Sequence, residues 1–166
     1  DQLPTLLAVP GVRLGTVSAW IKTPGRKDLV LIEAAPGTVA AAVFTRNAFC
    51  AAPVTVARDS LQATSFRPRY LLVNTGNANA GTGEPGMAAA RQCFEAVADA
   101  TAVSTPEVLP FSTGVIGEPL PVELIRAAVP SAVQALSADG WSDAAEGILT
   151  TDTRPKGLSV PFSCEG

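Results

Sequence analysis

An apolar run that leads through a Ser-Thr-Gly turn into an amphipathic stretch is the feature that most constrains how this chain can fold. Residues 108–111 have the length and composition of a short buried strand, and residues 121–129 begin with a proline and continue with an apolar face, as a helix does. The turn between them holds Ser112, Thr113 and Gly114. A strand, turn and helix in this order can aim backbone N–H groups and a hydroxyl at a developing negative charge, although most such turns are ordinary loops.

Hydrophobic patterning elsewhere predicts a mixed sheet with helices packed against it. Strands are expected over residues 11–22, 28–33, 38–44, 53–57, 70–73 and 157–162. The short connection makes residues 28–33 and 38–44 an antiparallel pair. Helices are expected over residues 86–100, 121–129 and 139–149. Pro130 should end the second helix, and Ser142 should cap the third.

Two further polar stretches stand out beside the Ser-Thr-Gly turn. Residues 74–86 are rich in glycine and asparagine, which favours a tight loop whose side chains bond their own backbone. Their spacing is neither that of a dinucleotide fingerprint nor that of a Walker motif, so no nucleotide site is expected. Residues 150–153 place hydroxyls just after a predicted helix, where the alternative interpretation is a helix end stopped by Pro155.

Composition limits the classes of protein that remain. With 166 residues, of which 47% are hydrophobic, we expect one domain over 1–166 with a flexible arm at 1–10. A net charge of −3 gives no basic surface for nucleic acid, and no run of apolar residues is long enough to span a membrane. There is no signal-peptide pattern. Cys50, Cys93 and Cys164 lack metal-site spacing, so we expect no zinc site or disulfide framework and a reducing, cytoplasmic location.

The absence of histidine narrows the chemistry further. The chain has no histidine at all, so neither a Ser-His-Asp nor a Cys-His arrangement can be built from it alone. A histidine-ligated metal centre is excluded for the same reason. Nucleophilic chemistry would need another base, and one solution is an N-terminal amine that serves its own threonine hydroxyl.

Four motifs, taken in order, resemble one known family. They are residues 42–47 (Ala-Val-Phe-Thr-Arg-Asn), 73–80 (Val-Asn-Thr-Gly-Asn-Ala-Asn-Ala), 112–117 (Ser-Thr-Gly-Val-Ile-Gly) and 148–156 (Ile-Leu-Thr-Thr-Asp-Thr-Arg-Pro-Lys). The chain is similar, over about residues 11–156, to the α chain of ornithine acetyltransferase, an arginine-biosynthesis enzyme that is often also an N-acetylglutamate synthase. The resemblance implies an α+β fold of αββα architecture, with two packed mixed sheets completed by a separate β chain.

The same resemblance implies a mechanism and a set of site residues. The family's precursor cuts itself before a threonine, which becomes the first residue of the β chain and carries acetyl from N-acetylornithine to glutamate in a ping-pong reaction. Acetyl-CoA is a second donor in bifunctional members. Thr113 and Gly114 match the two positions of the oxyanion hole, and Thr150 matches a substrate-binding position. We expect no cofactor and no metal, and we expect an αβ hetero-oligomer, α2β2 or larger.

The match departs from the family pattern near its end. Residues 159–162 are not followed by the family's lysine- and glycine-containing segment or by the nucleophile. We therefore expect this chain alone to be inactive and to supply half of a site. Two alternatives stay open: a self-processing aminopeptidase of related fold, which would release amines to water and form no N-acetylglutamate, and a non-catalytic binding subunit, which leaves the hydroxyl- and glycine-rich motifs unexplained.

Overall fold

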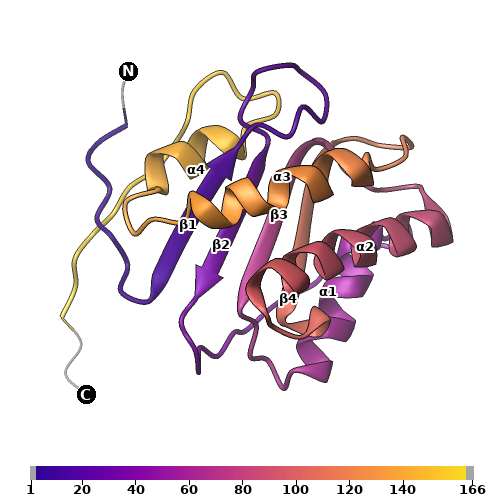
Figure 1. Cartoon of the computed structure of the whole chain (residues 1–166), viewed down its shortest axis with the longest axis horizontal. Coiled ribbons are helices and arrows are strands. Elements are labelled where there is room, and N and C mark those ends of the chain that lie inside the picture. The colour runs from indigo at the N-terminus through magenta and orange to yellow at the C-terminus, as the bar shows by residue number, and fades with distance from the viewer. Residues whose placement is uncertain (1–2, 164–166) are drawn as a thin grey trace.

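The computed structural model describes residues 3–163 as a four-stranded mixed sheet with helices on both sides (Figure 1). The strands lie in the order β1 (Val12–Val17), β2 (Leu29–Ala34), β3 (Tyr70–Asn77) and β4 (Val108–Val115). β2 is antiparallel to both β1 and β3, whereas β3 and β4 are parallel. The expected mixed α and β architecture is confirmed. The second sheet and the separate chain stay predictions, as does the single domain, because residues 3–163 form one sheet.

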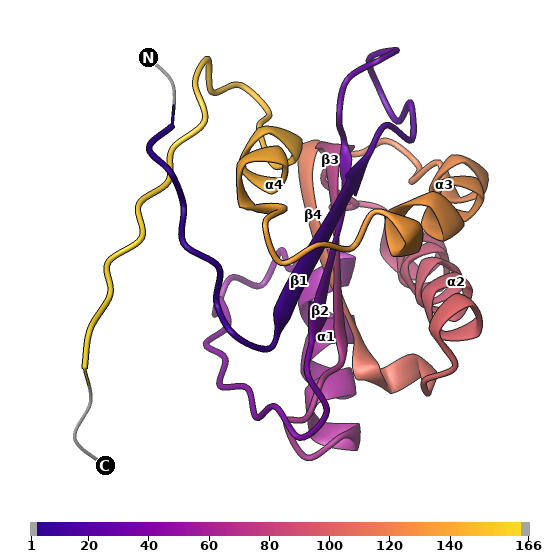
Figure 2. The ribbon, with the colours of Figure 1, turned by 60° about the vertical axis from the view of Figure 1, so that its left-hand side comes forward.

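A long crossover connects the parallel strands β3 and β4, as parallel pairing requires. After β3 the chain forms α2 (Gly83–Thr101) and the short 3₁₀ helix η1 (Thr105–Glu107), and then enters β4. α2 packs beside α3 (Val122–Gln134) on one face of the sheet (Figure 2). The helix predicted for residues 86–100 is confirmed, and its Ala90, Phe94 and Val97 side chains are buried in this core.

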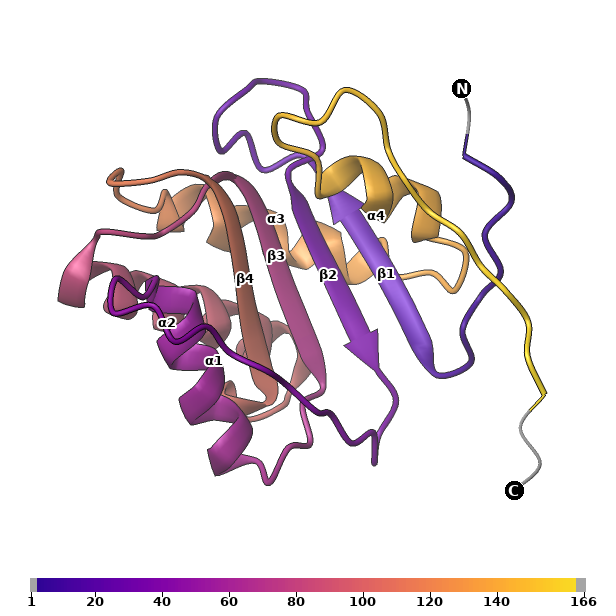
Figure 3. The same ribbon diagram turned by 180° about the vertical axis from the view of Figure 1, so that it is seen from behind.

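The other face of the sheet is covered less completely. α4 (Trp141–Gly147) packs over β1 and β2, where Leu14, Val30 and Ala144 form a second, smaller core. α1 (Ala52–Ala63) lies along β4 and also contacts α2. Between these helices the sheet is crossed only by irregular chain, with the segment before α1 passing in front of β3 and β4 in Figure 3. The two terminal segments run side by side, and the Leu7 N–H donates to Ser159 Oγ at 2.9 Å.

Residues 53–57 were expected to form a strand, and this prediction is wrong. They begin α1, where Pro53 occupies the first turn. The buried residues of α1 recur every three to four positions, as on one face of a helix, and this spacing continues beyond residue 57; they are Ala52, Pro53, Val56, Ala57, Ser60 and Leu61. Proline is tolerated in a first helical turn because its missing N–H would have no partner there.

The strands expected at residues 38–44 and 157–162 are also absent from the described structure. Both edges of β2 are already taken by β1 and β3, so no edge remains to pair with residues 38–44. That segment instead crosses the sheet as irregular chain, with the Val43 side chain fully exposed. Residues 157–162 run beside the N-terminal segment without joining a ladder.

Three further local expectations need correction. Ser112, Thr113 and Gly114 are not a turn after the strand but belong to β4 itself, paired with β3. Pro130 does not end α3, which continues to Gln134. α4 forms where expected, but its N-cap is Gly140, not Ser142, and no side chain caps it.

Candidate active site

A polar cavity of about 450 Å³ lies at the carboxyl ends of the parallel strands β3 and β4. Ligands commonly bind at this end of parallel strands. Its walls come from the loop between β1 and β2, from the ends of β3 and β4, and from the segment after α4; they comprise Lys22, Thr23, Arg26, Asp28, Thr75, Gly76, Thr113, Gly114, Val115, Thr150 and Thr151. The three residues that the sequence singles out, Thr113, Gly114 and Thr150, therefore line one cavity.

The floor of this cavity is a close contact between two glycines. In the ladder of β3 and β4, Thr75 pairs with Thr113 and Gly76 with Gly114. Gly76 has a φ of +98° and Gly114 a φ of +136°. A Cβ atom on Gly114 would come within 2.3 Å of the Gly76 carbonyl carbon and 2.6 Å of the Asn77 nitrogen. The strands can approach this closely only because side chains are absent, and their backbone is left uncovered beside the cavity.

Thr113 and Thr75 occupy paired positions but have different surroundings. Thr113 is exposed, and among residues 3–163 its hydroxyl has no hydrogen-bond partner. Thr75 is buried, its hydroxyl lies 3.0 Å from Gly147 O, and its N–H donates to Asp28 O at 2.9 Å. Thr75 thus fixes the floor to the end of α4, whereas the hydroxyl of Thr113 is free to contact a ligand.

A buried carboxylate shapes the loop that forms the opposite wall. Asp28 stands just before β2, and its carboxylate accepts the N–H of Ala19 at 2.6 Å and of Ile21 at 2.7 Å. Burial of a carboxylate is tolerated when such donors satisfy it. The loop that Asp28 holds in this way brings Lys22 and Arg26 to the cavity.

The two cations at the cavity have different partners. Lys22 Nζ lies 2.9 and 2.8 Å from the two carboxylate oxygens of Glu118, which forms an exposed ion pair. The Arg26 guanidinium donates to the carbonyl oxygens of Leu149 and Thr150. Among residues 3–163, Arg26 has no carboxylate partner. Its guanidinium is therefore bound by backbone carbonyl oxygens at the cavity wall and not by a carboxylate.

Sequence reasoning missed Lys22, Arg26, Thr75 and Gly76 as residues of this cavity. The Thr-Gly dipeptide at Thr75 repeats the one at Thr113, and this repeat was a usable signal for two strands that end at the same place. The charges at Lys22 and Arg26 carried no such signal, because charged residues in a turn are usually solvated.

The tight loop predicted for residues 74–86 is confirmed only for residues 78–82, because residues 74–77 complete β3 and residues 83–86 begin α2. The expectation that asparagine side chains in this stretch bond nearby backbone groups is confirmed. Asn77 Oδ1 accepts the N–H of Asn79 at 2.8 Å, and Asn79 Nδ2 donates to Gly86 O at 2.9 Å. Asn77 Nδ2 also donates to Pro119 O at 3.0 Å, which joins the stretch to the loop after β4. These buried amides hold the backbone beside the cavity and do not line it.

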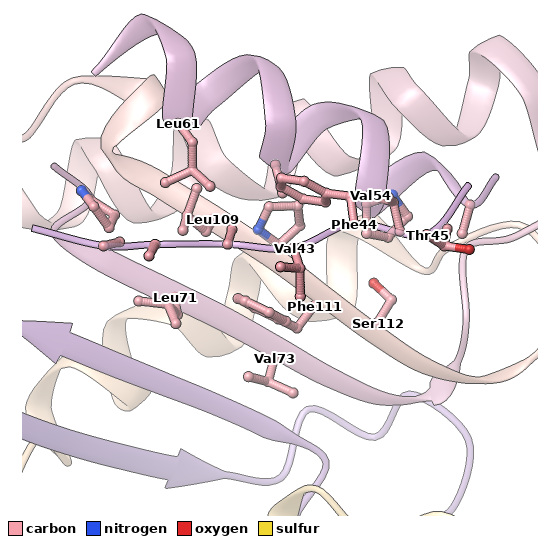
Figure 4. A pocket seen from close by; sticks show the side chains of 18 of the residues that line it. Val43, Phe44, Thr45, Val54, Leu61, Leu71, Val73, Leu109, Phe111 and Ser112 are labelled. Atoms are coloured by element: carbon pink, nitrogen blue, oxygen red, sulfur yellow. The ribbon is translucent and has the colours of Figure 1, made fainter. Parts of the chain in front are cut away.

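Two larger cavities, of about 690 and 630 Å³, lie on the less covered face of the sheet. Figure 4 shows the first, in which Leu71 and Val73 of β3 and Leu109 and Phe111 of β4 face the irregular segment that carries Val43. Their linings are mostly apolar, so they hold few groups that could act on a substrate. The smaller polar cavity is therefore the better candidate for chemistry.

The described residues give no sign of a metal site or of a membrane span. Among residues 3–163, no cluster of three or more histidine, cysteine, aspartate or glutamate side chains could hold a metal ion. No helix in the same part of the chain has the length and hydrophobicity that crossing a membrane requires. Cys164, one of the three cysteines, lies outside the described residues.

Comparison with known proteins places these features in a family. The sequence profile of the ArgJ family matches residues 13–166. The arginine biosynthesis bifunctional protein ArgJ of Pseudomonas syringae pv. tomato is 58% identical over 164 residues, which are 99% of this chain and 40% of that protein. The protein of the same name from Methylococcus capsulatus is 60% identical over 151 residues, or 91% of this chain and 36% of that protein. The chain thus spans about 40% of the length of these curated relatives.

Solved structures agree. The crystal structure of ornithine acetyltransferase from Mycobacterium tuberculosis, in complex with ornithine, has a TM-score of 0.81 and 38% identity, covering 87% of this chain and 78% of that chain. The structure of the arginine biosynthesis bifunctional protein ArgJ from Bacillus halodurans matches with a TM-score of 0.78 and 33% sequence identity, and the match covers 87% of this chain and 75% of that chain. The fold, the ordered motifs and the sequence match agree over nearly the whole chain, which belongs to the ArgJ family.

Proposed function

We propose that this chain forms part of an acyltransferase that moves acetyl from N-acetylornithine to glutamate, with Thr113 and Gly114 as the oxyanion hole and Thr150 as a substrate-binding residue. The observation that carries the proposal is that these three residues, from two distant motifs, line one polar cavity. The names of the relatives, a bifunctional protein of arginine biosynthesis and an ornithine acetyltransferase, support the choice of substrates.

The proposed reaction has two acyl-transfer halves. A threonine hydroxyl at the start of the partner chain attacks the acetyl carbonyl of N-acetylornithine, the C–N bond breaks, and ornithine leaves as an amine that carries the proton from that hydroxyl. The amino group of glutamate then attacks the acetyl ester, which regenerates the threonine and releases N-acetylglutamate. The α-amino group of the threonine takes and returns the proton, and this chain itself offers no histidine for that role. Both halves pass through a tetrahedral oxyanion, which the donors at Thr113 and Gly114 would stabilise.

A partner chain is part of the proposal. The chain spans about 40% of the length of the curated relatives it matches, and we propose that a second chain corresponds to the remainder. Two apolar cavities, one of about 690 Å³ (Figure 4) and one of about 630 Å³, lie on the less covered face of the sheet, where a second sheet would bury them. Phe111 on this face is 44% exposed, which is costly for a large aromatic side chain. We therefore propose an αβ hetero-oligomer in the cytoplasm that uses no cofactor.

Substitution of Thr113 tests the proposed oxyanion hole. In the complete protein, Thr113→Ala should lower kcat for N-acetylglutamate formation by roughly 10²–10³, the usual effect of losing one such donor. Ser131→Ala removes an exposed hydroxyl from α3, away from the cavity, and should leave the rate unchanged. Normal turnover by Thr113→Ala would remove Thr113 from the mechanism.

Product analysis tests the reaction type. Mass spectrometry of the reaction with N-acetylornithine should find N-acetylglutamate only when glutamate is present. Release of acetate and ornithine at an equal rate without glutamate would indicate a self-processing hydrolase, and no turnover by the complete protein would favour a binding subunit. Replacing N-acetylornithine by acetyl-CoA in the same assay shows whether the second donor is used.

A further inference from the structure

The segment that carries Thr150 has little regular structure of its own. α4 ends at Gly147, and the N–H of Leu149 still donates to Glu146 O at 3.1 Å. The carbonyl oxygens of Leu149 and Thr150 accept from the guanidinium of Arg26, whose Nη1 and Nη2 both lie 3.4 Å from Thr150 O. Arg26 therefore ties this segment to the opposite wall of the cavity.

Hydrogen bonds hold the backbone of the loop that carries Arg26. Arg26 lies in the loop between β1 and β2, and its N–H donates to Thr23 O at 3.3 Å. The buried Asp28 accepts the N–H groups of Ala19 and Ile21 and so closes the same loop. Because these bonds hold the loop, the position of Arg26 can in turn determine the position of the segment that it contacts.

Two side chains hydrogen-bond to different carbonyl oxygens at the end of α4. Thr75 holds Gly147 O from the floor of the cavity, at 3.0 Å, and reaches no later carbonyl. Among residues 3–163, no side chain other than Arg26 donates to Leu149 O or Thr150 O. A cation is also favourable here because carbonyl oxygens at a helix C-terminus carry partial negative charge.

We propose that Arg26 is a positioning residue that holds Thr150 against the cavity, facing Thr113 and Gly114. The inference rests on the proposed function, because it concerns the substrate-binding role of Thr150. Without the guanidinium, residues 148–151 lose their side-chain connection to the opposite wall, and Thr150 shifts relative to the oxyanion hole. A displacement of about 1 Å in a group that orients substrate is enough to slow a reaction considerably.

Lys27 offers a matched control on the same loop. Its Nζ lies 2.7 Å from Asp143 Oδ1 and 2.9 Å from Glu146 Oε2, so it also connects the loop to α4. It contacts neither carbonyl that Arg26 holds, and both of its ion pairs are exposed. Exposed ion pairs contribute little, so Lys27→Ala should change kcat/KM by less than about threefold.

A double-mutant cycle in the complete protein tests the inference. Arg26→Ala should lower kcat/KM for N-acetylornithine roughly tenfold to a hundredfold, as loss of a charged hydrogen-bond donor does. Because Arg26 acts through Thr150, combining Arg26→Ala with Thr150→Ala should cost no more than Thr150→Ala alone. Guanidinium ion added to the assay should restore part of the activity of Arg26→Ala and none of that of Thr150→Ala.

The possible results separate the inference from the function on which it rests. Fully additive losses in an active enzyme, or an Arg26→Ala enzyme with normal kcat/KM, overturn the role of Arg26 and leave the acetyltransferase proposal intact. A complete wild-type protein that forms no N-acetylglutamate overturns both. If Arg26→Ala does not fold, Arg26→Lys keeps the cation, and its combination with Thr150→Ala completes the cycle in its place.

Discussion

Gly114 has a structural requirement that is independent of any catalytic role. Its φ of +136° lies in a region that residues with a side chain rarely adopt, and an added Cβ would overlap the backbone of Gly76. The proposed oxyanion hole requires its N–H, whereas the strand contact requires that it have no side chain. Substitution here therefore reports on folding before it reports on catalysis, which makes Thr113 the better probe of mechanism.

Two glycine substitutions separate steric overlap from backbone conformation. Gly114→Ala combines a positive φ with overlap on β3 and should lower the free energy of unfolding by on the order of 3–5 kcal/mol. Gly117→Ala is the control, because its φ of +81° is also positive but a Cβ there meets nothing within 4 Å. Gly117→Ala should lower the free energy of unfolding, measured by urea denaturation, by about 1–2 kcal/mol. Equal losses for both variants would show that the close contact does not limit stability.

Residue identity alone could predict only part of the site. Thr113, Gly114 and Thr150 were accessible because they stand in motifs that resemble a family. Arg26 was not, because its role depends on carbonyl groups more than a hundred residues further along the chain, and no local pattern indicates that contact.

The sequence predicted the elements whose buried residues recur with a clear helical period. It did not predict the elements whose structure depends on which neighbouring strand is free to pair. The helical stripe through Ala90, Phe94 and Val97 predicted α2 because burial on one side needs no knowledge of the partner. Residues 38–44 have the composition of a strand but find no free edge beside β2. β4 likewise extends through Gly114 because β3 offers a ladder there, which local turn propensity could not reveal.

Cys93 gives α2 a chemical reporter. The thiol is 3% exposed, and burial raises its pKa to about 12. Because this folded-state pKa lies above the unfolded value, the stabilising contribution of the protonated thiol is complete below about pH 9 and is lost as the pH rises toward 12.

Alkylation should therefore distinguish two cysteines of the folded protein. We expect iodoacetamide at pH 8 to label Cys50, which is only half-buried, and to label Cys93 at the rate at which α2 separates from the sheet. Peptide mass spectrometry over time measures both rates in one sample, with urea-unfolded protein as the control. Equal rates in the folded protein would contradict the tight packing of α2.

For the molecule as a whole, the two faces of the sheet differ in how completely they are covered. α2 and α3 bury one face, whereas α4, α1 and irregular chain leave apolar cavities on the other (Figure 3). The sequence predicted a mixed sheet with helices, but it did not show how the helices divide between the faces. That division follows from packing between distant elements.

Hydrogen exchange should detect a partner chain on the less covered face. In the complete protein, amides of residues 38–45 and those near Phe111 should exchange more slowly than in this chain alone. Amides of α2 should be unchanged, because that helix already packs on the opposite face. Identical exchange at residues 38–45 in both samples would contradict docking on this face.

The bond between Arg26 and Thr150 joins residues 124 positions apart in the sequence. On a ribosome, the first wall of the cavity is thus synthesised long before the last. The cavity cannot exist on a nascent chain until the segment after α4 has emerged, because closing so long a loop comes late in folding. Any chemistry that this cavity supports is therefore confined to chains whose synthesis has passed residue 150.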